Sequence, residues 1–328
     1  MTVVVIVVVM ALIFDLLNGM NDAANSIATI VSTKVLKPRQ AVIMAAFCNF
    51  AALFVFELKV ANTIGKGVVN PDIVTLPMVA TGLISSGLWL WLTTFLGIPI
   101  SASHSLVGGL IGPVLIQGGI SALNLSGISK VVIFIFFSPL LGFVLGYILM
   151  VVSYLIVRRK TPYKVDSIFR KLQLISASLF SLSHGGNDAQ KTMGIIAIAL
   201  YSGGLLGDKF YVPYWVAFAS YLTIAIGTYL GGWKVIETMG HKVTKLRPIS
   251  GFSAETSAGL SIIFASVLGV PISTTHTIAG SIMGVGAIQR FTAVKWGLAG
   301  KLFIAWIITI PVTTITSALL YYSYKIIF

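Results

Sequence analysis

The chain has 328 residues, of which 57% are hydrophobic and 9% are charged, with a mean hydropathy of +0.98. This composition excludes an ordinary water-soluble globular domain and predicts a polytopic helical membrane protein, in which about ten spans of ~20 residues would fit. The net charge of +13 does not indicate nucleic-acid binding, because Lys and Arg lie in loops between apolar runs, as topology signals at a membrane surface do. Cys48 is the only cysteine, so the sequence offers no disulfide framework.

The first apolar run, residues 2–17, is interrupted by the polar stretch 19–26. At ~1.5 Å per residue the run is shorter than the hydrocarbon core, so we expect it to continue through the polar stretch. Gly19 is expected to mark a helix break, with Asn21 or Asp22 capping a second half-helix. A carboxylate inside hydrocarbon costs roughly 2.5–3.5 kcal/mol on insertion scales, so Asp22 is a functional-site candidate.

Two further spans, 41–56 and 73–96, lead to a second polar motif at 97–105. Pro99 stops a helix, and Ser101 can cap a new one near the membrane boundary or within a re-entrant turn. The polar side chains that follow are Ser103, His104 and Ser105. A long apolar run, 131–157, then ends in a dense basic cluster at the midpoint of the chain.

The second half of the chain repeats both motifs. The Gly-x-Asn-Asp-Ala pattern of the first motif recurs at Gly185, Asn187 and Asp188, and is followed by Gln190 and Lys191. The residues 269–277 match 97–105 at Gly, Pro, Ile, Ser and His. The matching segment contributes Pro271, Thr275, His276 and Thr277.

These matched motifs divide the chain into two repeats, 1–157 and 172–328, joined by a basic cytoplasmic linker, 158–171. We expect about five crossings in each repeat, and an odd number inserts the second repeat upside down. With both termini outside, the cytoplasmic loops hold sixteen Lys and Arg and the outer positions hold five, which is the positive-inside bias. Inverted repeats with broken helices near the midplane are typical of secondary transporters, so we expect one all-α transport domain.

The motif residues fall into two chemical groups. Asp22, Asp188, Asn21 and Asn187 offer hard oxygen ligands suited to Na⁺. Donors suited to an oxyanion are supplied by Asn25, Ser103, Ser105, Gln190, Lys191, Thr275 and Thr277. An anion beside two carboxylates is repelled unless cations lie between them, so the set predicts joint binding of a cation and an anion. Phosphate keeps a proton that an Asp or amide oxygen can accept, whereas sulfate only accepts, so acceptor groups favour phosphate.

Other polar residues have plainer interpretations. His104 and His276, beside hydroxyls at a helix start, are interpreted as structural hydrogen-bonding groups, and Gly19, Gly185, Pro99 and Pro271 as structural or gating positions. Glu255 follows a basic loop, and the sequence leaves open whether it is a solvated acid or a ligand of the coupling cation. Asp15 is interpreted as an acid that pairs with a neighbour.

At these motifs the chain resembles the inorganic phosphate transporter (PiT) family of sodium- or proton-coupled phosphate symporters. The resemblance covers nearly the whole chain and includes residues 19–25, 184–194 and both Pro-Ile-Ser segments. It implies phosphate uptake, essential roles for Asp22 and Asp188 at a central site, and a homodimer. The segment 251–255, which ends in Glu255, resembles an acidic motif of the family. Animal relatives carry a glutamate where this chain has Asn49, which leaves the coupling stoichiometry open.

The sequence therefore predicts a phosphate importer in the cell's inner membrane, driven by Na⁺ symport and without a cofactor. A proton-coupled phosphate or metal-phosphate carrier is the first alternative, and a sulfate permease is the next. An intramembrane hydrolase using the two histidines and the aspartates is the remote alternative, because no His-Glu-x-x-His or Gly-x-Ser-x-Gly pattern is present. The expected partners are phosphate, Na⁺ or H⁺, the lipid bilayer and a second copy of the chain.

Overall fold

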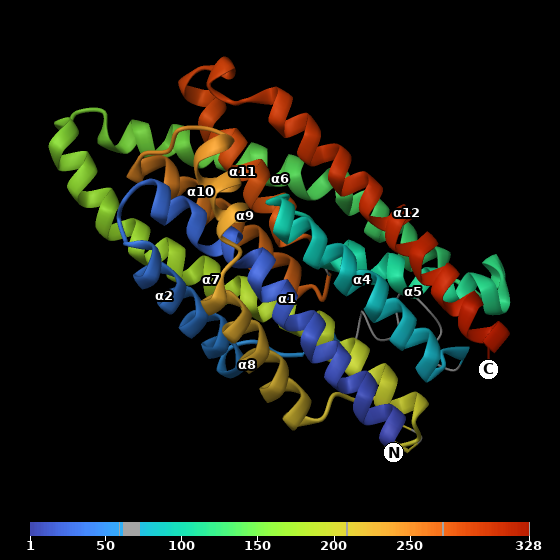
Figure 1. Cartoon of the computed structure of the whole chain (residues 1–328). Helices are drawn as coiled ribbons and strands as arrows, with labels where there is room; N and C mark the ends of the chain where they lie inside the picture. Colours follow the sequence, from blue (N-terminus) through green and yellow to red (C-terminus); the bar gives the residue numbers. More distant parts are fainter. Residues whose placement is uncertain (59, 62–72, 208, 271, 328) are drawn as a thin grey trace.

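The computed structural model describes residues 1–58, 60–61, 73–207, 209–270 and 272–327, and this part of the chain is helical with no strand (Figure 1). The helices of the first half are α1 Thr2–Ser32, α2 Pro38–Ala51, η1 Ala52–Phe54, α4 Leu76–Leu96, α5 Ala102–Gly118, η3 Ile120–Ala122 and α6 Leu125–Val157. Those of the second half are α7 Pro162–Ser202, α8 Tyr214–Leu230, α9 Trp233–Glu237, η4 Thr238–Lys242, α10 Pro248–Val267, α11 Thr274–Gln289, η5 Phe291–Ala293 and α12 Trp296–Ile327.

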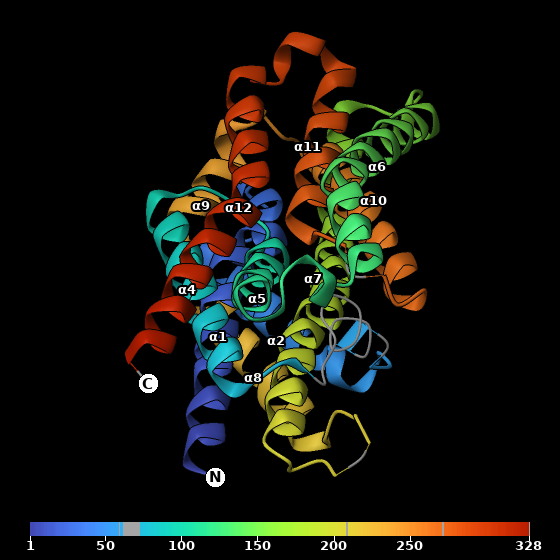
Figure 2. The same ribbon diagram turned by 90° about the vertical axis from the view of Figure 1, so that its right-hand side faces the viewer.

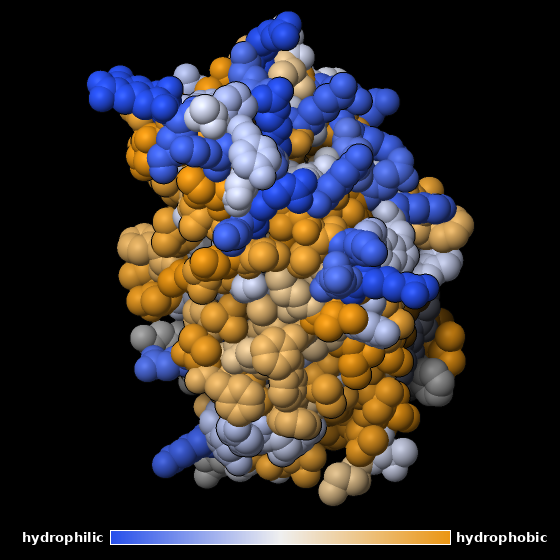
Figure 3. Space-filling view, turned by 90° about the vertical axis from the view of Figure 1, so that its left-hand side faces the viewer, coloured by the Kyte–Doolittle hydropathy of each residue, from blue (hydrophilic) through white to orange (hydrophobic). Residues whose placement is uncertain are grey.

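Four of these helices, α1, α4, α6 and α12, are long and apolar enough to cross a membrane. A fifth candidate is α8 together with the segment Trp233–Lys242, which is bent against it by 67°. Figure 3 shows that the middle of the face in view is mainly apolar, with hydrophilic side chains gathered mainly at one end. The chain is thus an all-α polytopic membrane protein. The other helices are shorter or carry the polar motifs, so five crossings per half remains a prediction.

Residues 97–101 form the tip of the helical hairpin α4–α5, and the described residues of the second motif lie at the tip of the hairpin α10–α11. Helix α4 ends at Gly97, which adopts a left-handed conformation with φ 74°, and α5 begins after Ser101, whose Oγ accepts the backbone N–H of His104 (3.3 Å). In the second half, Ser273 caps α11 in the same way, accepting from the N–H of His276 (3.2 Å). The helix break and serine cap expected at 97–105 are therefore confirmed, and Ser273 repeats the cap in the second half.

The helix break expected at Gly19 is wrong, because α1 continues without interruption from Thr2 to Ser32. Helix α7 likewise continues through Gly185. Both glycines serve close helix packing instead. A Cβ on Gly19 would lie 2.4 Å from the carbonyl oxygen of Ile224 on α8, and one on Gly185 would lie 2.6 Å from Cα of Asn49 on α2.

The helices pack in matched pairs: α1 lies against α8 and α7 against α2, while α5 packs on α12 and α11 on α6. Both chain termini lie at the same end of the molecule, opposite the loops that join α6 to α7 and α11 to α12 (Figure 2). The first of these loops holds part of the basic cluster, but the segment 158–171 is helical from Pro162 onward. The basic residues of this cluster therefore lie on a loop and on the first turns of α7.

Candidate functional site

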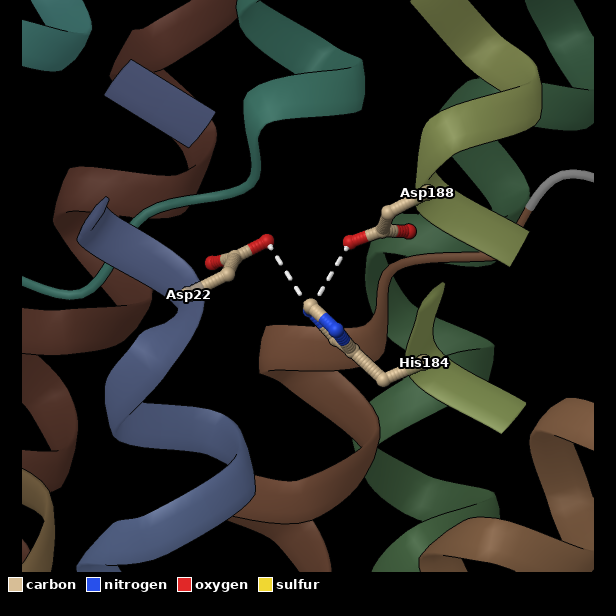
Figure 4. A group of neighbouring side chains, drawn as sticks. All are labelled: Asp22, His184 and Asp188. Atoms are coloured by element: carbon tan, nitrogen blue, oxygen red, sulfur yellow. Dashed lines mark ion pairs between the residues drawn. The ribbon is translucent and has the colours of Figure 1, made fainter. Parts of the chain in front are cut away.

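Two aspartates and a histidine face one another in the centre of the bundle (Figure 4). His184 Nε2 lies 3.2 Å from an Asp188 oxygen and 3.6 Å from an Asp22 oxygen. All three side chains are buried, and their ligand atoms lie within 4.8 Å of one another. No other such group of three His, Cys, Asp or Glu side chains occurs among the described residues.

Helix geometry brings these three residues together. His184 and Asp188 are four residues apart on α7 and therefore share one face of that helix. Helix α1 runs antiparallel to α7, and its Asp22 faces the same point from the other side (Figure 4). The close approach at Gly19 and Gly185 fixes both helices against their neighbours.

A hydrogen-bond chain sets the orientation of the His184 ring. Its Nδ1 lies 3.3 Å from Asn49 Oδ1, and the Asn49 amide nitrogen donates to the Thr228 hydroxyl (2.8 Å). That hydroxyl donates to the carbonyl of Ile224 (2.9 Å), so it can only accept from Asn49. The Asn49 oxygen must then face the ring, and Nδ1 carries the proton. Nε2 faces the two carboxylates and either carries a second proton or directs a lone pair toward them. In both cases a positive charge is favoured among the three groups.

The second aspartate is also held from the α11 side. Lys191 Nζ donates to Asp188 (2.5 Å) and to the carbonyl of Ile272 (3.0 Å), and the Thr274 hydroxyl donates to the other Asp188 oxygen (2.9 Å). Lys191 is 3% exposed, so this cation is almost completely withdrawn from solvent. A buried cation and the N-terminal end of α11 therefore lie side by side, which suits an anion.

The first aspartate meets the hairpin tips through Thr275. The Thr275 hydroxyl accepts from the Asn25 amide (2.9 Å) and lies 3.0 Å from Asp22 and 3.1 Å from the carbonyl of Ile100. Its single proton serves one of these two acceptors at a time. Thr275 thereby connects α1, the tip before α5 and the start of α11 at one point.

The two expected asparagine ligands occupy matching positions. Asn21 donates its amide to Thr94 Oγ1 (2.7 Å), and Asn187 donates to Ser266 Oγ (3.0 Å), at the ends of α4 and α10. The side-chain oxygens of both asparagines, like that of Asn25, are buried without a hydrogen-bond partner among the described residues. Oxygen ligands are thus left available around the two aspartates.

Three of the expected anion donors are not brought to the aspartates. Gln190 accepts from the backbone N–H groups of Val60 and Ala61 and donates to the carbonyls of Glu57 and Gly186. The hydroxyls of Ser105 and Thr277 donate to carbonyls of Ser86 and Ser273. Ser103 is buried in the first turn of α5.

Glu255 forms a separate cluster. Its carboxylate accepts from the Thr29 hydroxyl (2.6 Å), the Gln173 amide (2.9 Å) and the Ser176 hydroxyl (2.5 Å). Glu255 is 0% exposed, so the interpretation as a solvated acid is wrong. Thr29 is seven residues beyond Asp22 on α1, which places this cluster about 10 Å along the helix from the aspartates.

The two motif histidines meet between the hairpins. The rings of His104 and His276 lie 4.8 Å apart between centroids, and His276 stacks on Trp306 at 4.0 Å. The Trp306 indole N–H donates to the carbonyl of Pro99 (3.0 Å), which anchors the first tip. Pro271 lies outside the described residues.

His184 and Thr274 are the site residues that the sequence motifs alone did not indicate. The first Asn-Asp motif has Asn18 where His184 stands, and the first Pro-Ile-Ser motif has Ala102 where Thr274 stands. Neither residue has a counterpart of the same kind in the first repeat, so comparison of the two repeats did not identify them. The spacing of four residues between His184 and Asp188 was the available signal.

Known phosphate transporters resemble this chain along nearly its whole length. A model of the phosphate transporter family matches residues 18–317. A probable low-affinity inorganic phosphate transporter of Rhizobium meliloti is 52% identical over 96% of this chain and 95% of its own, and one of Bacillus subtilis is 41% identical over 99% and 98%. A solved structure described as a sodium-dependent phosphate transporter superposes with a TM-score of 0.91 at 27% identity, covering all of both chains. The chain therefore belongs to the phosphate transporter family, whose members are transporters and not enzymes.

Proposed function

We propose that this chain imports inorganic phosphate by cation symport, with Na⁺ as the coupling ion. The main support is that Asp22, His184 and Asp188 lie together beside the buried Lys191. A cation and an anion bound at these neighbouring positions would neutralise each other. The sodium-dependent phosphate transporter that superposes on the whole chain supports the same choice of ion.

The cation ligands in this proposal are carboxylate and amide oxygens. Asp22 and Asp188 supply the charge, and Asn21 and Asn187 supply side-chain oxygens that have no other partner among the described residues. Glu255 is proposed as a ligand of a further Na⁺, together with the hydroxyl oxygens of Thr29 and Ser176 once their protons turn away.

The anion in this proposal lies where the N-terminal ends of α5 and α11 meet. Lys191, Asn25, Thr275 and Ser103 surround this point and can donate to phosphate oxygens. The carboxyls of Asp22 and Asp188 can accept the proton that phosphate keeps. Gln190, Ser105 and Thr277 would have to leave their present backbone partners to reach the anion.

We further propose alternating access between two inverted repeats, 1–157 and 172–328, with 158–171 as the junction. The matched packing of α1 on α8 and α7 on α2 supports this, as do the matched bonds of Asn21 and Asn187. The termini lie together at the end opposite the α6–α7 loop, which fits both termini outside and basic loops inside the cell membrane. A homodimer is proposed on the family resemblance.

Proton coupling is the second candidate, and His184 is the observation that favours it. A proton on Nε2 would place a cation between the two carboxylates without Na⁺. Uptake of radiolabelled phosphate into proteoliposomes, with the Na⁺ gradient and the pH gradient imposed separately, tests both candidates. The proposal predicts accumulation with a Na⁺ gradient at equal pH. Accumulation driven only by the pH gradient would replace Na⁺ by H⁺.

A further inference from the structure

Asp15 is a buried carboxylate outside the site described above. It lies on α1 and is 0% exposed. One of its oxygens accepts from the Thr192 hydroxyl of α7 (2.8 Å), and the other has no hydrogen-bond partner among the described residues. A carboxylate oxygen buried in this way is costly unless another group compensates it.

A second unmatched acceptor lies one helical turn away. Asn18 follows Asp15 by three residues and therefore shares its face of α1. It is 2% exposed, and its side-chain oxygen also lacks a partner among the described residues. The Asn18 side chain also interacts with the Asp15 carboxyl, so the two unmatched oxygens belong to side chains that are in contact.

The position of Asp15 follows a regular pattern along the seam between α1 and α7. Asp15, Asp22 and Thr29 are spaced by seven residues, so they lie on one face of α1 at intervals of about 10 Å. Asp15 accepts from Thr192, and Asp22 lies beside His184, both partners being on α7. Thr29 donates to the carboxylate of Glu255 on α10, which also accepts from Ser176 of α7. Polar groups thus follow one another along the seam on both sides of the central aspartates.

We propose that Asp15, Asn18 and Thr192 form a further Na⁺ site, two helical turns from Asp22 toward the N-terminal end of α1. The ligands are one carboxylate, one amide oxygen and one hydroxyl oxygen, which are the hard oxygen donors that suit an alkali cation. Na⁺ here would satisfy both unmatched acceptors at once. The inference rests on the proposed Na⁺ coupling and adds a cation to it.

The site is specific to the first repeat. Alignment of the two Asn-Asp motifs places Ser181 at the position of Asp15, and the Ser181 hydroxyl donates within its own helix to the carbonyl of Ala177 (2.8 Å). The seam therefore has no equivalent carboxylate at that position. Ser181→Ala is accordingly the matched control, because it changes a buried hydroxyl of α7 without touching a proposed ligand.

The test is equilibrium binding of radioactive Na⁺ to the purified full-length protein in the absence of phosphate. Asp15→Asn is expected to remove one equivalent of bound Na⁺ while Asp22→Asn removes another, and Ser181→Ala is expected to bind like the wild type. Asp15→Asn keeps the size of the side chain and the acceptor for Thr192. Thr192→Val provides an independent variant, which should weaken Na⁺ binding while Asp15 remains.

The Na⁺ site at Asp15 and the coupling of phosphate uptake to Na⁺ can be refuted separately. If Asp22→Asn lowers Na⁺ binding and neither Asp15→Asn nor Thr192→Val does, the site at Asp15 is refuted and Na⁺ coupling stands. If the wild-type protein binds no Na⁺, both are refuted. If Asp15→Asn leaves Na⁺ binding intact but changes the pH dependence of phosphate uptake, the compensating group is a proton and the Na⁺ site is refuted.

Discussion

His184 stands between the two aspartates, and its replacement is informative about the cation. If the Nε2 lone pair of His184 helps to hold the cation beside the two carboxylates, His184→Leu removes that contact. We therefore expect the half-saturating Na⁺ concentration for uptake to rise about tenfold, equivalent to ~1.4 kcal/mol. Asn49→Leu removes the group that orients the ring and should shift Na⁺ activation in the same direction by less. Asn49→Asp keeps an acceptor for the N–H at Nδ1 of His184, so its Na⁺ activation should be closer to that of the wild type than that of Asn49→Leu.

The measurement is phosphate uptake as a function of Na⁺ concentration. Ser153→Ala is a suitable control, because Ser153 pairs with Ser253 in a buried contact between α6 and α10 (3.2 Å) and touches no site residue. Unchanged Na⁺ activation in His184→Leu would remove the histidine from the cation site.

Lys191 is proposed to lie on the anion side of the same site. We expect Lys191→Ala to weaken phosphate binding by about tenfold or more, because a charge-assisted contact at a helix N-terminus is lost and Asp188 is left unneutralised. Lys191→Arg keeps the positive charge, so it should lose less phosphate affinity than Lys191→Ala. Direct binding of phosphate at saturating Na⁺ measures this. A Lys191→Ala protein with wild-type affinity would place the anion elsewhere.

At the scale of single helices, the glycines of the two Asn-Asp motifs control packing. Gly19→Ala and Gly185→Ala each put a Cβ within 2.6 Å of a neighbouring backbone atom, so we expect each to destabilise the protein by about 1–3 kcal/mol. Gly87→Ala on α4 is the control, because its Cβ would meet no atom closer than 3.9 Å. Thermal unfolding in detergent should separate the first two variants from the third. Equal melting temperatures would contradict the packing role.

Gly19 also shows what the sequence could not predict about these helices. A glycine among polar residues has the same pattern whether it breaks a helix or admits a neighbouring backbone, and only the position of Ile224 distinguishes the two. The hairpin tips were predictable, because Pro99 followed by Ser101 combines a helix stop with a cap. Glu255 was ambiguous because its partners come from α1 and α7, far away in the chain.

At the scale of the whole molecule, the topology can be tested with cysteines placed at the two ends. In a Cys48→Ser background, Lys164→Cys lies in the first turn of α7, which begins at the end opposite the termini (Figure 2). Leu205→Cys lies in the loop between α7 and α8, and this loop is at the same end as the termini. Both positions are exposed. We expect a membrane-impermeant thiol reagent added to intact cells to label the cysteine at 205 and not the one at 164. Labelling of both from one side would contradict the proposed orientation.

The fold class could be predicted from the sequence, whereas some long-range contacts could not. The composition was sufficient to predict a polytopic helical protein. The two repeated motifs were sufficient to predict that Asp22 and Asp188 lie near each other. The sequence did not indicate that Gln190 supports the segment around Val60, because that contact depends on the path of a distant loop.

Joint binding of a cation and an anion at Asp22, Asp188 and Lys191 can be measured by calorimetric titration of phosphate at several Na⁺ concentrations. We expect phosphate affinity to rise with Na⁺ concentration in the wild type. Asp22→Asn should weaken phosphate binding and flatten this dependence, because linkage between two ligands is reciprocal. An Asp22→Asn protein whose phosphate affinity keeps the wild-type dependence on Na⁺ would contradict this joint binding.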